Sequence, residues 1–88
     1  MNFEFDPKKA IANLHKHGVA FVEVEPVFYD DFALTREDAD AAGEARFVTV
    51  GVDALGSVVA VCWTQRGESI RLISARLASP QERKSYES

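Results

Sequence analysis

The sequence predicts an α+β domain in which two N-terminal helices and a C-terminal helix pack on one face of an antiparallel sheet. Three observations lead to this fold class. A capped amphipathic stretch lies near the N-terminus, three strand-like stretches separated by short turns fill the second half, and a capped polar stretch follows them. With 88 residues, 47% of them hydrophobic, the chain has the size and composition of one small globular domain, residues 1–88.

The first helix is predicted over residues 7–17. Asp6 is a favourable N-cap, Pro7 suits the first helical position, and Gly18 is a typical C-terminal cap. Apolar residues recur between them at helical spacing, which gives the helix one buried stripe.

A second helix is predicted near residues 20–28, where apolar side chains again follow a helical spacing. Pro26 opposes this prediction because a proline inside a helix removes a hydrogen bond and clashes with the preceding turn. The helix must therefore be short or kinked, and the alternation of Val22 and Val24 leaves an extended segment as the second choice. A short strand at 32–35 and a polar loop follow.

The sheet is predicted from residue 46 onward. Two strand-like stretches, "RFVTVGVD" and "SVVAVCWTQ", are joined by a tight turn at Gly56, and "RG" then leads into a third, "ESIRLISAR". The final "SPQERKSYES" predicts a helix, because Ser79 is an N-cap, Pro80 takes the first position, and Glu82 completes a capping box.

Composition excludes several classes of protein. No apolar run reaches the roughly 18 residues of a transmembrane helix, and no basic head precedes an apolar stretch as in a secretory signal, so we expect a cytosolic protein. The single cysteine, Cys62, lies in an apolar run and is expected to be a core residue. His15 and His17 face different ways on a helix, and no cofactor motif is present, so neither a metal nor a cofactor is expected.

Charge is distributed unevenly along the chain, whose net charge is −4. Residues 1–45 hold four basic and ten acidic residues, whereas residues 46–88 hold six basic and four acidic ones. Alternation places Arg71 on a sheet face, with Arg66 in the turn before it, Arg76 at the strand's exit and Arg46 at the start of the first strand. Such a cluster suits a phosphate, although the same arginines could equally form surface ion pairs.

Three stretches of this sequence resemble the BrnT family of bacterial toxins. "FEFDPKKAIANLHKHGVAF" is similar to the family's opening "FEWDPxKxxxNxxKHGVSF", and "GEARFVTVG" is similar to "GExRFxxxG". "TQRGESIRLISARLASPQERKSYE" is similar to "TxRGxxIRIISARxAxxxExxxYE". The resemblance runs from Phe3 to Glu87, in the same order and at the same spacing.

The resemblance implies a RelE-like fold, with two helices, a twisted antiparallel sheet and a C-terminal helix. It also implies a metal-independent ribonuclease toxin of a type II toxin–antitoxin system, which is bound by a BrnA-like antitoxin and touches operator DNA only through that antitoxin.

Cleavage of this kind would need groups that hold phosphate and groups that move protons. We expect Arg66 and Arg71 to contact the RNA phosphate, followed by Arg46 and Arg76. The expected candidates for proton transfer are Lys8, His17, Glu44 and Tyr86.

One departure from the family pattern bears on activity. Many members carry a histidine after "DxD" in the loop before "GEARF", where this chain has Ala41. An alternative reading is therefore a homologue without turnover that serves as a binding partner of the antitoxin or of RNA. A third is a small scaffold domain with structural arginines.

Overall fold

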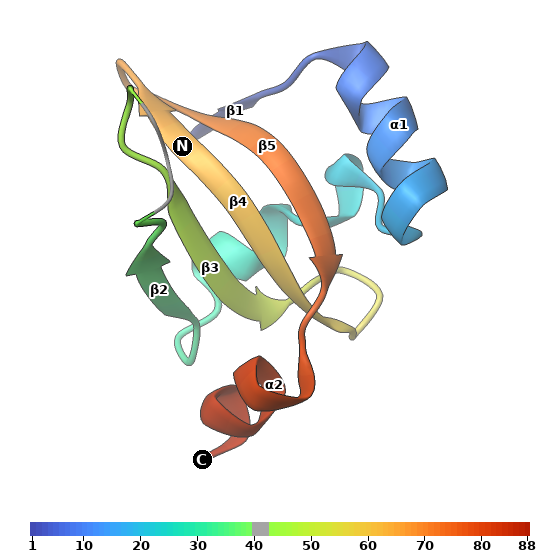
Figure 1. Cartoon of the computed structure of the whole chain (residues 1–88), viewed down its shortest axis with the longest axis vertical. Coiled ribbons are helices and arrows are strands. Elements are labelled where there is room, and N and C mark those ends of the chain that lie inside the picture. Colours follow the sequence, from blue (N-terminus) through green and yellow to red (C-terminus); the bar gives the residue numbers. More distant parts are fainter. Residues whose placement is uncertain (40–42) are drawn as a thin grey trace.

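The chain folds around a five-stranded mixed sheet (Figure 1). The computed structural model describes residues 1–39 and 43–88. One edge strand runs parallel to its neighbour, and the remaining neighbours are antiparallel. In their order across the sheet, the strands are β1 (Asn2–Glu4), β5 (Ser69–Leu77), β4 (Val58–Arg66), β3 (Phe47–Val52) and β2 (Leu34–Glu37).

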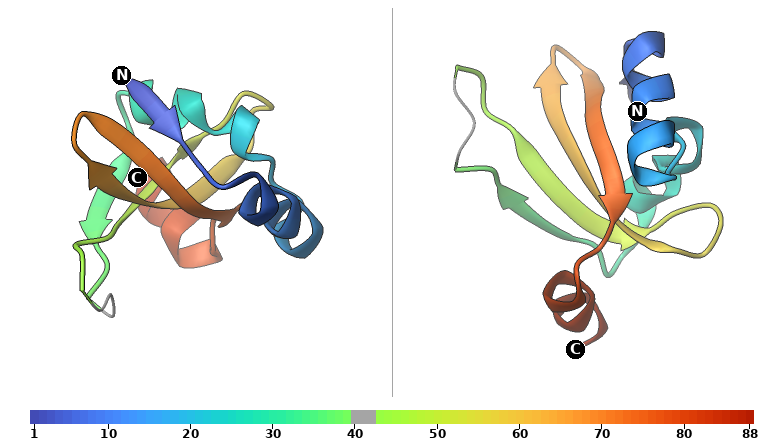
Figure 2. Two further views of the ribbon diagram at one scale, coloured as in Figure 1. Left: turned by 90° about the horizontal axis from the view of Figure 1, so that it is seen from above. Right: turned by 45° about the vertical axis from the view of Figure 1, so that its right-hand side comes forward.

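Helical segments lie on both faces of this sheet, so the prediction that the helices share one face is wrong (Figure 2). Helix α1 (Pro7–His17) and the 3-10 helices η1 (Phe21–Glu23) and η2 (Glu25–Tyr29) pack on one face and form the main core with β4 and β5. Helix α2 (Pro80–Glu87) contacts β3 on the other face, where a smaller apolar cluster lies.

The prediction of a second N-terminal α-helix is wrong. Residues 20–28 form the two short 3-10 helices η1 and η2, which meet at Val24. Pro26 explains the break, because it has no N–H to donate to a carbonyl four residues earlier and its ring clashes there. The first 3-10 helix also has no side-chain cap at Ala20. Phe21, Val24 and Val27 are nevertheless buried, so the apolar pattern marked core residues correctly.

The prediction of an antiparallel sheet, as in a RelE-like fold, is also wrong. Strand β1 pairs in parallel with β5, with Phe3 opposite Ile70. A parallel pair cannot be joined by a tight turn, so nothing local in the sequence indicates this pairing. The predicted strand at 32–35 is found slightly later, as β2.

The remaining element predictions are confirmed. The first helix spans Pro7–His17, with the Asp6 side chain accepting from the Lys8 N–H at 2.9 Å and Gly18 closing it at a φ of 72°. The three central strands form an antiparallel meander. The C-terminal helix begins with the predicted capping box between Ser79 and Glu82.

A single buried amide fastens α1 to the sheet. Strand β1 pairs only with the first three residues of β5, so the later part of that edge has no strand beside it. The Asn13 side chain takes this place: its Oδ1 accepts from the Ala75 N–H at 3.0 Å, and its Nδ2 donates to the carbonyls of Ala75 and Val19, both at 2.9 Å. Asn13 is buried, so water cannot take the place of these hydrogen bonds.

We therefore expect Asn13→Ala to lower the free energy of unfolding by about 2–4 kcal/mol, because it leaves the backbone groups of Ala75 buried without partners. Lys16→Ala, on an exposed position of the same helix, is the matched control and should change it by less than about 0.5 kcal/mol. Urea denaturation of both variants measures the difference. Equal stabilities would show that Asn13 is not a structural fastening.

Candidate functional site

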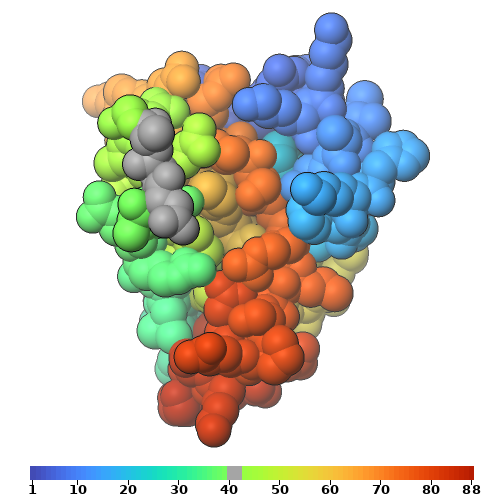
Figure 3. Space-filling model, in the orientation of Figure 1, coloured from blue at the N-terminus to red at the C-terminus, as the bar shows by residue number. Residues whose placement is uncertain are grey.

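The predicted arginines gather on the sheet face that α2 covers at one end, here called the open face. Val48 and Ala60 belong to the apolar cluster on this face, and the alternation of side chains carries Arg46 to the same side as Val48. In register, Arg36 lies opposite Val48 and Arg76 lies opposite Ala60. Figure 3 looks onto this face, with α2 below it.

Among the described residues, Arg66 and Arg71 each make one ion pair, near the same end of β4 and β5. Arg71 Nη1 lies 3.4 Å from Glu4 Oε1, and Arg66 Nε lies 3.6 Å from Glu44 Oε2. The Arg66 side chain is 52% exposed and that of Arg71 is 30% exposed. Long, partly exposed pairs of this kind contribute little to stability, so another anion can replace the carboxylate.

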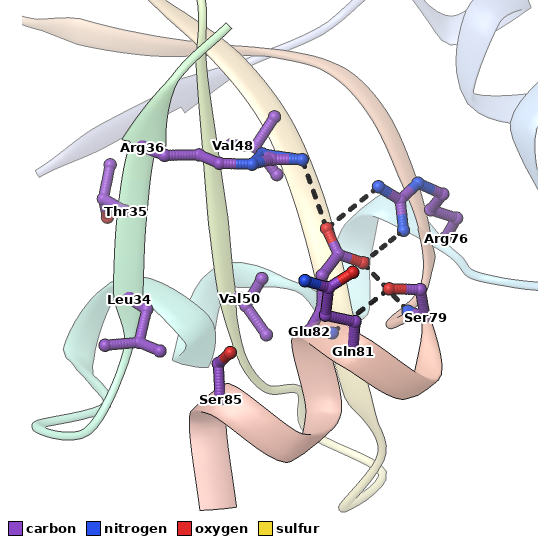
Figure 4. Close-up of a pocket in the computed structure, with 10 residues that line it drawn as sticks. All are labelled: Leu34, Thr35, Arg36, Val48, Val50, Arg76, Ser79, Gln81, Glu82 and Ser85. Carbon is purple, nitrogen blue, oxygen red and sulfur yellow. Dashed lines mark hydrogen bonds and ion pairs between the residues drawn. The ribbon is translucent and has the colours of Figure 1, made fainter. Parts of the chain in front are cut away.

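Arg76 is held much more firmly. Its Nη1 and Nη2 donate to Glu82 Oε1 and Oε2 at 2.7 and 3.1 Å, and Arg36 Nη2 reaches the same Oε2 at 3.3 Å (Figure 4). The hydrogen bond from Arg76, aided by the Ser79 N–H, lowers the pKa of Glu82 from 4.5 to about 2. The same bond raises the pKa of Arg76. The carboxylate of Glu82 thus ties α2 to both β2 and β5.

Arg46 differs from the other arginines. Its Nε is buried and has no hydrogen-bond partner in the described part of the chain. Arg46 lies close to Cys62, as do Asp38 and Arg36: burial raises the pKa of the Cys62 thiol, Asp38 raises it further, and the two arginines lower it.

The four residues proposed for proton transfer lie in different parts of the fold. Glu44 lies beside Arg66. Lys8 and His17 stand in the first and last turns of α1, roughly 14 Å apart at the rise of a helix, and α1 packs with the core of the other face. Tyr86 donates to Asp30 Oδ2, which lowers the pKa of Asp30 and raises that of Tyr86. Ala41 lies outside the described residues.

A cavity of about 550 Å³ opens between β2, β3 and α2 (Figure 4). Leu34, Val48 and Val50 form its apolar floor, and its rim includes Arg36 and Gln81. Sequence reasoning missed both Arg36 and the cavity, because Arg36 was assigned to a loop and the cavity forms from segments far apart in the chain. The strand-like "LTRE" was the one local signal that could have placed Arg36.

The described residues also bear on metal binding and on membrane insertion. Within residues 1–39 and 43–88, no group of three or more His, Cys, Asp or Glu side chains is placed to hold a metal ion. None of the described helices is long and apolar enough to cross a membrane.

Comparison with known proteins decides the family. The profile of "Ribonuclease toxin, BrnT, of type II toxin-antitoxin system" matches residues 5–82, which is most of the chain. The chain belongs to the BrnT family. Its structure is also similar to the crystal structure of the Brucella abortus ribonuclease toxin BrnT, with a TM-score of 0.70 and 26% sequence identity. That match covers 90% of this chain and 97% of the Brucella chain. A search of curated proteins gave no match.

Membership of the BrnT family places the chain in a biochemical class. The family consists of ribonuclease toxins of type II toxin–antitoxin systems, and a toxin of such a system implies an antitoxin partner. The open face of this BrnT chain combines exchangeable arginine–carboxylate pairs at one end with a firmly tied helix and a cavity at the other.

The low pKa of Glu82 predicts a defined pH dependence of stability. An ionised Glu82 stabilises the fold fully above its unfolded pKa of 4.5, and this contribution disappears as pH falls toward about 2. At pH 7 we expect Glu82→Gln to lower the free energy of unfolding by roughly 1–3 kcal/mol, because the charged Arg76 loses its negatively charged partner.

The difference between wild type and Glu82→Gln should shrink steadily between pH 4.5 and pH 2, as measured by denaturation at each pH. Glu87→Gln is the matched control, since Glu87 lies in the same helix and makes only an exposed 3.7 Å pair with Arg83. A difference that stays constant over this pH range would contradict the assignment.

Proposed function

We propose that this BrnT protein is an endoribonuclease that acts in the cytoplasm without a metal ion and that Arg71 and Arg66 bind the phosphate at the cleavage site. The observation that carries the proposal is the pair of long, partly exposed contacts that these arginines make with Glu4 and Glu44. A phosphate oxygen can replace a carboxylate there without disturbing the sheet that carries both guanidinium groups.

The proposed reaction uses the ribose 2′-hydroxyl of the RNA as the nucleophile. Its oxygen attacks the adjacent phosphorus, the bond to the 5′-oxygen breaks, and the proton of the 2′-hydroxyl is removed while the leaving oxygen gains one. Arginines on a rigid strand would orient the phosphate and stabilise the negative charge that develops on it. These permanently charged groups can fill the electrostatic role for which other nucleases use a metal ion.

Among the candidates for proton transfer, Glu44 is the best placed. It lies next to Arg66, so a phosphate that displaces it would leave its carboxylate beside the reacting atoms. Lys8 and His17 would have to reach the site from α1. Arg46, whose Nε has no partner among the residues that the structure describes, is a further candidate phosphate ligand, whereas the bidentate bond to Glu82 favours a structural role for Arg76.

A binding function without turnover is the second candidate. The pairing of Arg66, Arg71 and Arg76 with carboxylates favours it, because each pair neutralises a cation that RNA would otherwise attract. In this case the protein would act by binding a BrnA-like antitoxin, with operator DNA contacted only by that antitoxin.

Cleavage of RNA by purified protein separates the two candidates. In buffer containing EDTA, we expect wild type to cleave single-stranded RNA and Arg71→Ala to be slower by about 10²-fold, as when one charge-stabilising donor is removed from an active site. Arg83→Ala is the control, because Arg83 is exposed on α2 and, within residues 1–39 and 43–88, pairs with Glu87 alone. Cleavage by wild type that stops in EDTA would refute metal independence, and equal rates in all three proteins would refute the role of Arg71.

The proposed antitoxin is expected to use the acidic surface near η1 and η2 as part of its contact. Induced expression of this protein alone should arrest growth, and co-expression of the antitoxin from the same operon should restore it. Reversing the charges of Glu23 and Glu25 to lysine should weaken the purified complex by about tenfold or more, because the antitoxin segment that meets them is expected to be basic. Glu68→Lys, at an exposed turn, is the control, and an unchanged dissociation constant for the double variant would place the contact elsewhere.

A further inference from the structure

We propose that the cavity between β2, β3 and α2 binds one unstacked base of single-stranded RNA, and so contributes to the choice of cleavage site. This inference rests on the proposed ribonuclease function and adds a second binding site to it. RNA-binding proteins commonly read single-stranded RNA by taking individual bases out of the stack and holding them on apolar or planar surfaces.

The dimensions and the floor of the cavity suit a flat ring. Its volume of about 550 Å³ falls within the range of sites for small organic ligands. Leu34, Val48 and Val50 line the floor with aliphatic groups, on which the face of a base can lie (Figure 4). The cavity is open to solvent, so an RNA strand could approach it directly.

The rim offers polar groups that the fold does not use. The amide of Gln81 and the hydroxyl of Ser85 line the cavity, and neither makes a hydrogen bond to another group in the described part of the chain. An amide and a hydroxyl can each donate and accept, which is what recognition of a base edge requires. Both residues lie on α2, which Glu82 ties to the sheet, so their positions are fixed relative to the floor.

Arg36 is the cation available to the same nucleotide. Its side chain extends across Val48 toward Glu82 and is 57% exposed (Figure 4). Glu82 already receives two hydrogen bonds from Arg76, at 2.7 and 3.1 Å, so the 3.3 Å contact of Arg36 is the one that can open without releasing α2. A guanidinium group freed in this way can bind the phosphate of the nucleotide or stack on its base.

A nucleotide fits this cavity better than the apolar side chain of a protein partner. An apolar side chain would fill the floor, but it would offer no hydrogen bond to the exposed Gln81 amide or Ser85 hydroxyl. A nucleotide satisfies both and also brings a negative charge to Arg36. The other arginines of the open face, including Arg46 and Arg71, offer positions for the neighbouring phosphates.

The test blocks the cavity with a large side chain. Ser85→Trp fills it from the exposed rim, and Ser88→Trp places the same residue elsewhere on the end of α2 as the matched control. Gln81→Ala is a milder second variant, which removes one polar group without adding bulk. Cleavage sites on a random RNA pool are mapped for each protein, and binding is measured with labelled oligoribonucleotides that carry 2′-O-methyl groups and therefore cannot be cleaved.

We expect Ser85→Trp to bind these oligoribonucleotides about tenfold or more weakly than wild type, since one base contact is lost. Gln81→Ala should keep cleaving but lose the base preference at one position near the cut. Ser88→Trp should match wild type in both measurements, and thermal unfolding confirms that each variant is folded.

The outcomes separate this inference from the proposed function. Cleavage by wild type with unchanged sites and affinities in Ser85→Trp and Gln81→Ala would overturn the base-binding cavity and leave the ribonuclease function standing. RNA binding without cleavage, weakened by Ser85→Trp, would support the cavity and refute turnover. Ser85→Trp that binds RNA normally but no longer binds the antitoxin would assign the cavity to the protein partner and overturn the inference. No RNA binding by wild type would refute both.

Discussion

The architecture depends on the hydrogen bonds that the Asn13 amide makes to the edge of β5. Strand β5 faces the main core with one side and carries Arg71 and Arg76 of the open face on the other. Because β1 covers only its first residues, the rest of its edge would be open without Asn13. The amide acts as a one-residue substitute for a neighbouring strand, and it fixes α1 against the sheet at the same time.

Ion pairs with carboxylates explain how an acidic protein can present arginines on a sheet. Each of Arg66, Arg71 and Arg76 has a carboxylate partner, so the cations are held in position and their charge is neutralised. The pairs differ in strength. A single contact of 3.4–3.6 Å contributes little to stability, whereas the bidentate pair between Arg76 and Glu82 is part of the fold.

Local features of the sequence predicted local structure well. The caps at Asp6 and Ser79 set the beginnings of both α-helices, and the turns gave the central meander. The parallel pairing of Phe3 with Ile70 and the ion pair of Arg36 with Glu82 join residues far apart in the chain, and no spacing rule indicates them. The prediction for the 20–28 segment failed for a local reason. A helical spacing of apolar residues is satisfied equally well by 3-10 turns once Pro26 is present.

Glu82 also determines how mutations on the open face must be interpreted. Its carboxylate stands at the wall of the cavity, neutralises Arg76, and contributes to the capping box that starts α2. Replacing Arg76 would therefore release the helix that carries Gln81 and Ser85, and it would change the cavity as well as the charge. A loss of activity in an Arg76 variant is thus compatible with a purely structural role. Only residues such as Arg71, whose partner Glu4 belongs to the short edge strand β1, allow charge and architecture to be separated.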